Sequence, residues 1–322
     1  MLKRIASFAK KISPLQQIKD HALDKAGVNV LVKRDDLIHP AMGGNKWRKL
    51  KYNLIEANRQ GLSTLLTFGG AYSNHLYATA AAGQYFGFDT IGFVRGEAHF
   101  PLNPTLHAVT QMGMQLHYLS RSTYRNPLRA LESFADPLPP YYYLPEGGTN
   151  PLALVGCAEL AKEILDQCAE ASPDYYCLSC GTGGTMSGLL IGLEGKGKVI
   201  GFSALKGDFM ASNIQALLDE NAPSAYSNWQ MEHNYHFGGY ARHTLSLIEF
   251  INAFHAKHQI PLDPIYTGKL FYGLWEWIAQ GRFAKGSTIV VIHSGGLQGI
   301  KGFNQRQGKA LIEEDGQEGN RV

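Results

Sequence analysis

Short runs of β-branched and aromatic residues alternate with longer segments of helical periodicity along most of this chain. The short runs predict strands at 30–32, 65–68, 90–94, 115–118, 141–144, 175–179, 199–203 and 287–292. The longer segments predict helices at 44–58, 73–86, 104–112, 151–168, 185–193, 244–257 and 269–280. This alternation is typical of βαβ units, whose strands form mostly parallel sheets between layers of helices. The length of 322 residues favours two such sheets, each with its own helices.

Glycine is the residue whose placement constrains the function most. The chain has 36 glycines, a larger share than the roughly 7% that is usual. Many of them gather in clusters at 43–44, 69–70, 181–184 and 295–296, and three of these clusters directly follow a predicted strand. In open α/β sheets, ligands bind at the carboxyl ends of the strands, and a glycine turn that opens a helix presents free N–H groups to an anion. The clusters therefore predict one shared ligand site.

The strongest candidate for a phosphate cradle is the sequence Cys-Gly-Thr-Gly-Gly-Thr at 180–185. Its glycines allow the backbone to curl around an anion, and its threonine hydroxyls can add hydrogen bonds. It is not a nucleotide P-loop, because Leu189 stands where that motif needs lysine, and Met186 breaks the dinucleotide fingerprint. A simple tight turn between strand and helix explains the segment equally well.

Lys46 follows the first glycine pair and falls in the first turn of a predicted helix. A cation there opposes the helix dipole, so burial would depress its pKa, and a depressed pKa suits a lysine that forms a Schiff base. Lys49 and Lys51 lie on the same helix, and we interpret them as part of a solvated basic face.

Composition excludes several classes of protein. The net charge of +3 gives no basic footprint for nucleic acid, and no stretch approaches the roughly 20 apolar residues that a membrane span needs. Four cysteines cannot build a disulfide scaffold, and no secretory leader is evident. We therefore expect a cytoplasmic protein that acts on a small molecule. Cys177 and Cys180 form a Cys-x-x-Cys pair, for which burial in the core is favoured over zinc or redox chemistry.

The motifs taken together resemble the pyridoxal-phosphate enzymes of the 1-aminocyclopropane-1-carboxylate deaminase and D-cysteine desulfhydrase family. The resemblance covers nearly the whole chain in order, through segments 33–37, 43–50, 70–75, 144–151, 183–188, 263–269 and 293–297. It implies a two-domain, three-layer αβα fold like the tryptophan synthase β-subunit (fold type II), with mostly parallel sheets. The expected domains are a large cofactor-binding domain at 1–46 and 155–322 and a small domain at 47–154. The family is usually a homodimer.

The resemblance also implies roles for individual residues. Lys46 would carry pyridoxal 5'-phosphate as a Schiff base, Ser73 would be catalytic, and Tyr240 and Tyr266 would stack on the cofactor or transfer protons. The residues implied to bind the cofactor are Lys46, Asn74, Gly181, Thr182, Gly183, Gly184, Thr185, Tyr266 and Thr267. Those implied to meet the amino-acid substrate are Tyr72, Ser73, Asn74 and His75. No metal is expected.

Thr267 distinguishes the two branches of the family. Members that cleave the cyclopropane ring carry glutamate there, whereas a neutral threonine resembles the D-cysteine desulfhydrase branch. The expected reaction is an α,β-elimination that gives pyruvate, ammonia and hydrogen sulfide. Tyr72 and Tyr77 replace the glutamine and arginine of many relatives, and this leaves the substrate open. A 1-aminocyclopropane-1-carboxylate deaminase, a racemase and a non-catalytic protein that binds pyridoxal phosphate are the alternatives.

Overall fold

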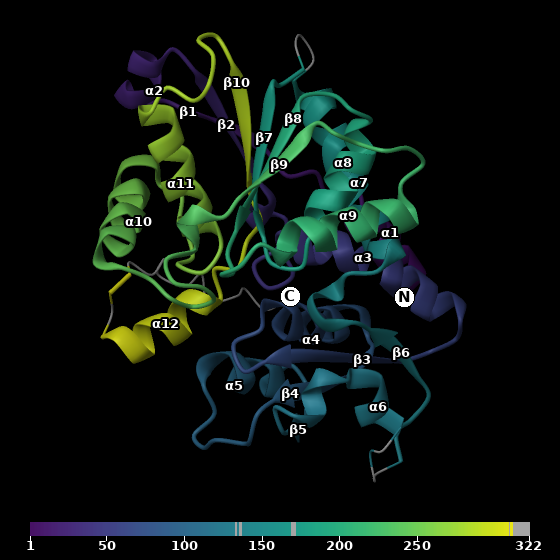
Figure 1. The fold of residues 1–322 in the computed structure, drawn as a ribbon. Helices are drawn as coiled ribbons and strands as arrows, with labels where there is room; N and C mark the ends of the chain where they lie inside the picture. Colours follow the sequence, from purple (N-terminus) through teal and green to yellow (C-terminus); the bar gives the residue numbers. More distant parts are fainter. Residues whose placement is uncertain (133, 135–136, 169–171, 309, 312–322) are drawn as a thin grey trace.

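The computed structural model describes residues 1–132, 134, 137–168, 172–308 and 310–311, and its strands form two separate sheets (Figure 1). In sheet A the strands follow the order β1 (Leu15–Ile18), β2 (Asn29–Arg34), β10 (Thr288–His293), β7 (Tyr175–Cys180), β8 (Lys198–Ser203) and β9 (Trp229–Glu232). Only β1 among these is antiparallel to its neighbour. In sheet B the order is β5 (Met114–Leu119), β4 (Asp89–Arg95), β3 (Thr64–Gly70) and β6 (Tyr141–Leu144), all parallel.

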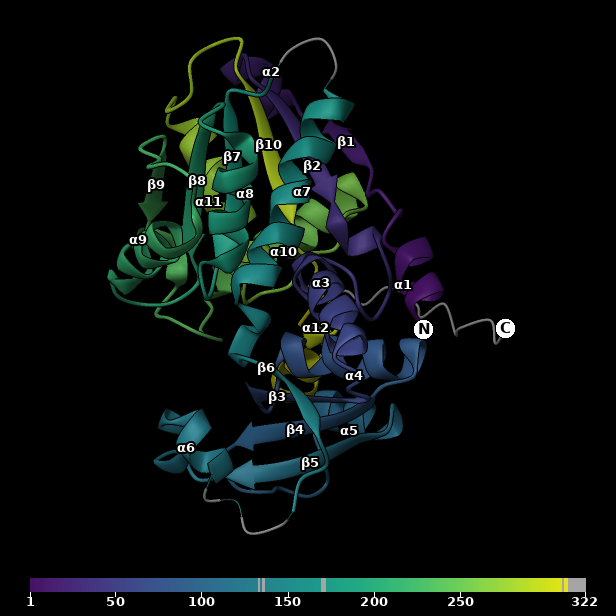
Figure 2. The same cartoon turned by 90° about the vertical axis from the view of Figure 1, so that its right-hand side faces the viewer.

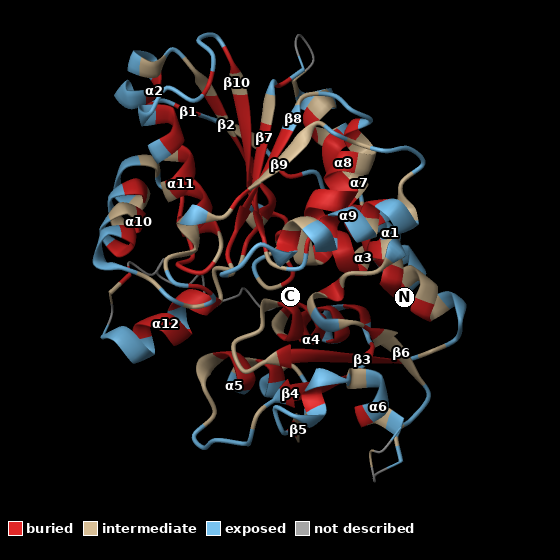
Figure 3. Cartoon of the chain, in the orientation of Figure 1, coloured by how far each residue is buried: buried red, intermediate tan, exposed pale blue. Residues whose placement is uncertain are grey.

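Sheet A is the middle layer of a three-layer arrangement. One face packs on α2 (His21–Ala26), α10 (Leu245–His258) and α11 (Thr267–Ala279). The other face packs on α7 (Pro151–Gln167), α8 (Gly184–Leu193) and α9 (Phe209–Asn221). Figure 3 shows the parallel strands of this sheet as mostly buried between the two helical layers. Their apolar runs therefore lack the alternation of a half-exposed sheet.

Sheet B has its own smaller core. Its face toward sheet A packs on α1 (Leu2–Phe8), α3 (Asn45–Arg59), α4 (Asn74–Phe86) and α5 (Pro104–Gln111). The opposite face is covered near η2 (Thr123–Arg125) and α6 (Pro127–Glu132). The last described helix, α12 (Gly299–Gln307), returns from sheet A to lie beside α5 (Figures 1 and 2).

Helix α3 is held firmly between the two sheets. A Cβ atom on Gly156 of α7 would lie 1.9 Å from the Arg48 carbonyl oxygen of α3, so only glycine permits this approach. The Arg48 guanidinium is buried and pairs with Asp35 at 2.6 Å and with Glu163 at 2.9 Å. These contacts fix the position of the helix whose first turn carries Lys46.

The expected α/β architecture is confirmed, and each predicted strand and helix is present to within two residues at its ends. The sequence pattern missed the short or terminal elements β1, β9, α1, α2, α6 and α12, and it also missed the 13-residue helix α9. The strands of sheet A come from residues 15–34 and 175–293 and those of sheet B from residues 64–144, and the expected domain boundaries at 46/47 and 154/155 stay a prediction. Within the described residues, none of the helices is long and apolar enough to cross a bilayer.

Candidate active site

A cavity of about 410 Å³ lies where the carboxyl ends of strands from both sheets meet. Sheet A contributes the segments that follow β7, β8 and β10, and sheet B contributes those that follow β3, β4 and β6. This is the edge at which α/β sheets bind ligands. Of the predicted site residues, the cavity is lined by Lys46, Ser73, Asn74, His75, Gly181, Thr182, Gly183, Thr185, Tyr240 and Tyr266.

The glycine loop after β7 forms an anion cup at one end of this cavity. Gly183 has a φ of 82°, and α8 begins immediately after it without a side-chain cap. The N–H groups of the first turn are therefore free to bind an anion. A Cβ on Gly184 would lie 2.7 Å from the Thr149 hydroxyl, so a larger residue would push the loop out of this shape. The alternative of a simple turn does not account for an uncapped helix end that faces a cavity.

Lys49 completes the cup, and the prediction that it belongs to a solvated face is wrong. Its side chain is only 2% exposed, and Nζ donates to the Gly147 carbonyl at 3.1 Å and to the hydroxyls of Thr149 at 2.9 Å and Thr182 at 3.1 Å. Among the described residues, Lys49 has no carboxylate within 4.0 Å. A buried ammonium without a counter-ion suits a phosphate group. Lys51 is not on a solvated face either, because its side chain is only 11% exposed, but it differs from Lys49 in pairing with Glu159.

Lys46 lies one helical turn before Lys49 and reaches the same carbonyl group. Its Nζ is 3.4 Å from the Gly147 oxygen. Burial in the cavity, with the Lys49 cation nearby, lowers the pKa of Lys46 to about 7. A large fraction of this lysine is therefore a neutral amine at physiological pH, which is the form that attacks an aldehyde. An anion cup and a nucleophilic amine in one cavity fit a phosphorylated aldehyde such as pyridoxal phosphate.

The start of α4 supplies polar groups on the sheet B side of the cavity. Ser73 caps this helix, because its Oγ accepts hydrogen bonds from the backbone N–H groups of His75 and Leu76, both at 3.2 Å. Its hydroxyl proton remains available for another acceptor. Asn74 Oδ1 accepts a hydrogen bond of 2.5 Å from Gln298, which leaves the Asn74 amide nitrogen as the donor. This end of α4 is suited to a substrate carboxylate.

His75 is buried beside these groups, and its ring nitrogens are unusual. Neither Nδ1 nor Nε2 has a hydrogen-bond partner among the described residues. Burial, together with the cations of Lys46 and Lys49, holds the pKa of His75 well below 6.5, so the ring is neutral. The His75 ring is therefore held by packing and not by hydrogen bonds to the described residues. In contrast, His293 bonds the Pro261 carbonyl at 2.7 Å, as a supporting histidine should.

The two predicted tyrosines meet at the far side of the cavity. Their ring centroids are 6.3 Å apart in an edge-to-face arrangement. Burial raises the pKa of Tyr266 well above 10, and burial also raises the pKa of Tyr240. Both phenols are therefore protonated at neutral pH and can donate hydrogen bonds. The Tyr266 ring lies against Gly181, where a Cβ would be 3.1 Å from Cε1.

Three predicted site residues do not line the cavity. The Gly184 backbone belongs to the first turn of α8, behind the loop. The Tyr72 ring packs under the Arg306 guanidinium, 4.5 Å away, on α12. Thr267 is fully buried and its hydroxyl donates to Asp263 at 2.8 Å, because Asp263 caps the start of α11. These contacts hold the side chains of Tyr72 and Thr267 in local packing.

The cavity also contains residues that the sequence analysis did not assign to it. These include Lys49, Arg95, Glu146, Ser179 and Ser294, whereas the Gly295–Gly296 cluster lines the cavity as expected. The spacing of Lys46 and Lys49 places them on one helix face, a signal that was available in the sequence. Arg95 and Ser294 each end or follow a predicted strand, so their position at a strand's carboxyl end was a second signal.

The Cys-x-x-Cys pair is structural. Cys177 and Cys180 are free and buried, and burial raises the pKa of Cys180 to about 12, so its thiol is protonated. The described part of the chain contains no cluster of side chains that could hold a metal ion. The expected burial of the two cysteines is confirmed.

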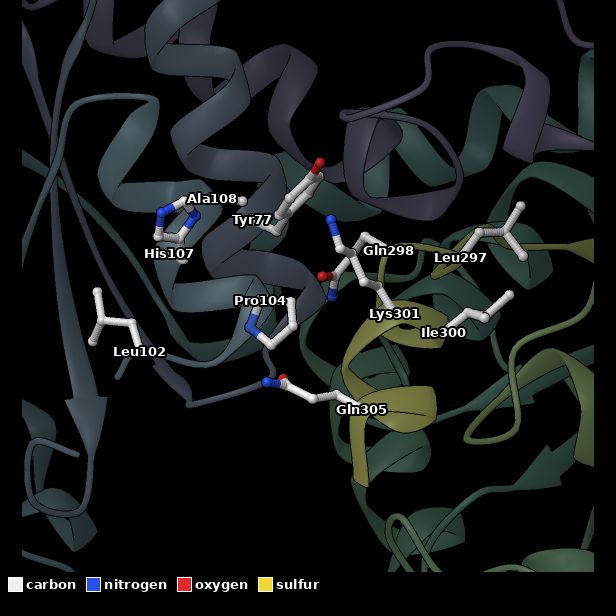
Figure 4. A pocket seen from close by; sticks show the side chains of 10 residues that line it. All are labelled: Tyr77, Leu102, Pro104, His107, Ala108, Leu297, Gln298, Ile300, Lys301 and Gln305. Carbon is white, nitrogen blue, oxygen red and sulfur yellow. The ribbon is translucent and has the colours of Figure 1, made fainter. Parts of the chain in front are cut away.

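A second, larger cleft of about 530 Å³ opens to the surface between α5 and α12 (Figure 4). It is lined by Tyr77, Leu102, Pro104, His107, Ala108, Leu297, Gln298, Ile300, Lys301 and Gln305. It contains no glycine loop and no buried lysine, so we assign the chemistry to the smaller cavity. Gln298 connects the two spaces, because it lines this cleft and also donates to Asn74.

Comparison with known proteins gives one family. The family model described as "Pyridoxal-phosphate dependent enzyme" matches residues 7–295. The bifunctional D-cysteine desulfhydrase/1-aminocyclopropane-1-carboxylate deaminase of Arabidopsis thaliana, a mitochondrial protein, is 31% identical over 85% of this chain and 74% of its own length. The D-cysteine desulfhydrase of Salmonella choleraesuis is 29% identical over 87% of this chain and 90% of its own.

The solved structures agree with this assignment. The crystal structure of a homologue of 1-aminocyclopropane-1-carboxylate deaminase matches 97% of this chain and all of its own, with a TM-score of 0.80 and 28% identity. A hydrogen sulfide-producing enzyme from Fusobacterium nucleatum shares the fold with a TM-score of 0.67, at 16% identity.

Proposed function

Because the chain belongs to the family of pyridoxal-phosphate-dependent enzymes, we propose that it is a lyase that eliminates a leaving group and ammonia from a small amino acid. The favoured reaction is that of a D-cysteine desulfhydrase, in which D-cysteine and water give pyruvate, ammonia and hydrogen sulfide. The observation that carries the proposal is the pairing of a neutral Lys46 amine with an uncapped helix end and a buried Lys49 in one cavity.

Each group in the cavity has a role that follows from its position. Thr182, Lys49 and the first N–H groups of α8 would hold the phosphate, and Lys46 would hold the cofactor aldehyde. Bound in this way, pyridoxal phosphate supplies an electron sink that weakens the bonds at the substrate Cα. With its amine free, Lys46 would be a base of suitable pKa to accept the Cα proton of the substrate.

The opposite wall positions the substrate. Ser73 and the start of α4 would bind the α-carboxylate and so fix the orientation of the Cα–H bond. The protonated phenols of Tyr240 and Tyr266 can donate hydrogen bonds to the sulfur atom of a departing thiolate. His75 is neutral, so it can accept a hydrogen bond at one nitrogen and donate at the other.

The resemblance at Thr267, whose side chain lies behind the cavity and bonds Asp263, favours elimination over opening of a cyclopropane ring. Thr267 provides no carboxylate to pair with a pyridinium nitrogen, so the cofactor would be a weaker electron sink. Departure of a thiolate demands less of that sink than ring opening does. The similarity to the homologue of 1-aminocyclopropane-1-carboxylate deaminase keeps ring opening as the second candidate.

The test compares product release from two substrates. The proposal predicts pyruvate from D-cysteine, with little 2-oxobutanoate from 1-aminocyclopropane-1-carboxylate. Lys46→Ala should abolish both the absorbance of the bound cofactor and the activity. Reversed substrate preference would favour the second candidate, and chiral chromatography of D- and L-serine would reveal a racemase. A purified protein without cofactor by mass spectrometry would refute the whole assignment.

A homodimer in the cytoplasm completes the proposal. The four cysteines are free thiols, which is consistent with a reducing compartment. Light scattering of the purified protein and fractionation of the source cells test the two statements separately.

A further inference from the structure

Two exposed side chains of opposite charge, Arg95 and Glu146, line the catalytic cavity, and the reaction described above uses neither. Arg95 ends β4, and Glu146 begins η3 (Glu146–Gly148), which follows β6. Because β4 and β6 flank β3 in sheet B, these side chains lie on either side of Ser73, which follows β3. The topology therefore places a cation and an anion beside the groups that would hold the substrate carboxylate.

Arg95 lies close to the substrate site. Its Nη2 is 3.6 Å from the position that a Cβ on Gly70 would occupy, three residues before Ser73. Its guanidinium carbon is 5.7 Å from the centroid of the Tyr124 ring. Among the described residues, no carboxylate lies within 4.0 Å of Arg95. The Arg95 guanidinium group is therefore exposed, lines the cavity and lacks a carboxylate, which is its strongest hydrogen-bond partner.

Glu146 is the matching anion. It also lines the cavity and has no cationic partner within 4.0 Å among the described residues. Both charges act on the Tyr240 phenol: burial raises the pKa of Tyr240, Glu146 raises it further and Arg95 lowers it. Arg95 and Glu146 line the same cavity as Ser73 and Tyr240, so a substituent on the substrate Cβ would lie within reach of both charges.

We propose that Arg95 and Glu146 form a subsite for a zwitterionic β-substituent, so that the preferred substrates are amino acids linked through sulfur to a second amino acid. Arg95 would bind the distal carboxylate through its two parallel N–H groups, and Glu146 would bind the distal ammonium. This inference rests on the proposed elimination. A single carboxylate or a single ammonium would satisfy only one of the two charges.

The chemistry balances with the groups already described. A base removes the Cα proton, and the Cβ–S bond breaks with its electron pair left on sulfur, which takes up a proton. The unsaturated amine that remains reacts with water to give pyruvate and ammonia. With lanthionine, the departing thiol is cysteine in place of hydrogen sulfide.

The test uses four thioether probes on the holoenzyme: meso-lanthionine, S-carboxymethyl-D-cysteine, S-(2-aminoethyl)-D-cysteine and S-ethyl-D-cysteine. They carry both charges, the carboxylate alone, the ammonium alone and neither charge. We expect kcat/KM for pyruvate release to be highest for meso-lanthionine and lowest for the S-ethyl probe, by at least about tenfold.

The variants assign each charge to its partner. Arg95→Gln should lower the ratio of kcat/KM for the S-carboxymethyl probe to that for the S-ethyl probe by at least about tenfold. It should leave the corresponding ratio for the S-aminoethyl probe unchanged or higher. Glu146→Gln should lower the ratio of kcat/KM for the S-aminoethyl probe to that for the S-ethyl probe, and it should leave the ratio for the S-carboxymethyl probe unchanged or higher. Arg95→Lys should keep only part of the preference for the S-carboxymethyl probe, because lysine cannot form two parallel hydrogen bonds with a carboxylate.

Two outcomes would overturn the inference. Equal kcat/KM values for all four probes would show that there is no charged subsite. An equal loss for all four probes in Arg95→Gln would show that Arg95 acts on the common part of the substrate. Failure of the proposed function is distinguishable, since D-cysteine and the S-ethyl probe would then release no pyruvate even from the unaltered enzyme.

Discussion

Replacement of Lys49 by methionine should change the acidity of Lys46, because the two ammonium groups reach the same carbonyl oxygen. Lys46 Nζ is 3.4 Å and Lys49 Nζ is 3.1 Å from the Gly147 oxygen, so the two nitrogens are at most about 6.5 Å apart. At an effective dielectric constant of about 20, two unit charges at that separation repel by about 2.6 kcal/mol, or about two pH units. Without the Lys49 cation, protonation of Lys46 requires less free energy.

The pKa of Lys46 should therefore rise in Lys49→Met from its value of about 7, by about one to one and a half units, because burial accounts for more than half of the lowering. Burial is the larger cause of the lowered value and persists in the variant, so the pKa should stay below 10.5. The measurement is the rate at which the cofactor-free protein takes up pyridoxal phosphate, followed by absorbance between pH 6 and 10. Only the neutral amine reacts, so the pH of half-maximal rate reports this pKa.

The matched control is Lys51→Met, on the same helix, because Lys51 is paired with Glu159 and does not line the cavity. It should leave the midpoint near that of the unaltered protein. Lys49→Met should also weaken cofactor binding by about ten- to a hundredfold, because a charge-assisted hydrogen bond contributes about 1.5–3 kcal/mol. A midpoint that stays constant or falls in Lys49→Met would refute the reasoning.

Three further substitutions test the scaffold. Arg48→Met should lower the free energy of unfolding by about 3–5 kcal/mol, because it leaves the Asp35 carboxylate buried without its cationic partner. The control Lys162→Met, which removes a surface ion pair, should change it by less than about 1 kcal/mol. Equal effects of the two substitutions in urea denaturation would contradict the importance of the buried pair. Gly44→Ala should prevent binding of the cofactor, because the new Cβ would lie 1.9 Å from the Ser294 carbonyl oxygen in the loop after β10. An unchanged absorbance spectrum of the bound cofactor in this variant would disprove the prediction. Burial lowers the pKa of Lys269 to about 8, so the folded protein releases this proton at lower pH than the unfolded chain does. The free energy of unfolding, relative to Lys269→Met, should therefore rise by about 3 kcal/mol between pH 8 and 10.5. A constant difference across that range would argue against this reasoning.

The local pattern of the sequence determined the scaffold. Strands and helices were predictable because their periods of about 2 and 3.6 residues are properties of neighbouring positions. The glycine loop at 181–184 and the position of Lys46 after a glycine pair were visible for the same reason, as both depend on backbone conformation over a few residues. The position of ligand sites at strand ends then placed these motifs near one cavity.

The tertiary structure decided which side chains share that cavity. Lys49 is charged and suited to a surface, yet the close approach of α3 and α7 and the loop at Gly147 bury it. Thr267 bonds Asp263 and Tyr72 packs on α12, so neither lines the cavity. The opposed charges of Arg95 and Glu146, 51 positions apart in the chain, become neighbours of one substrate site because β3 lies between β4 and β6. The sequence by itself shows the elements, and the order of strands in the sheets determines which residues meet.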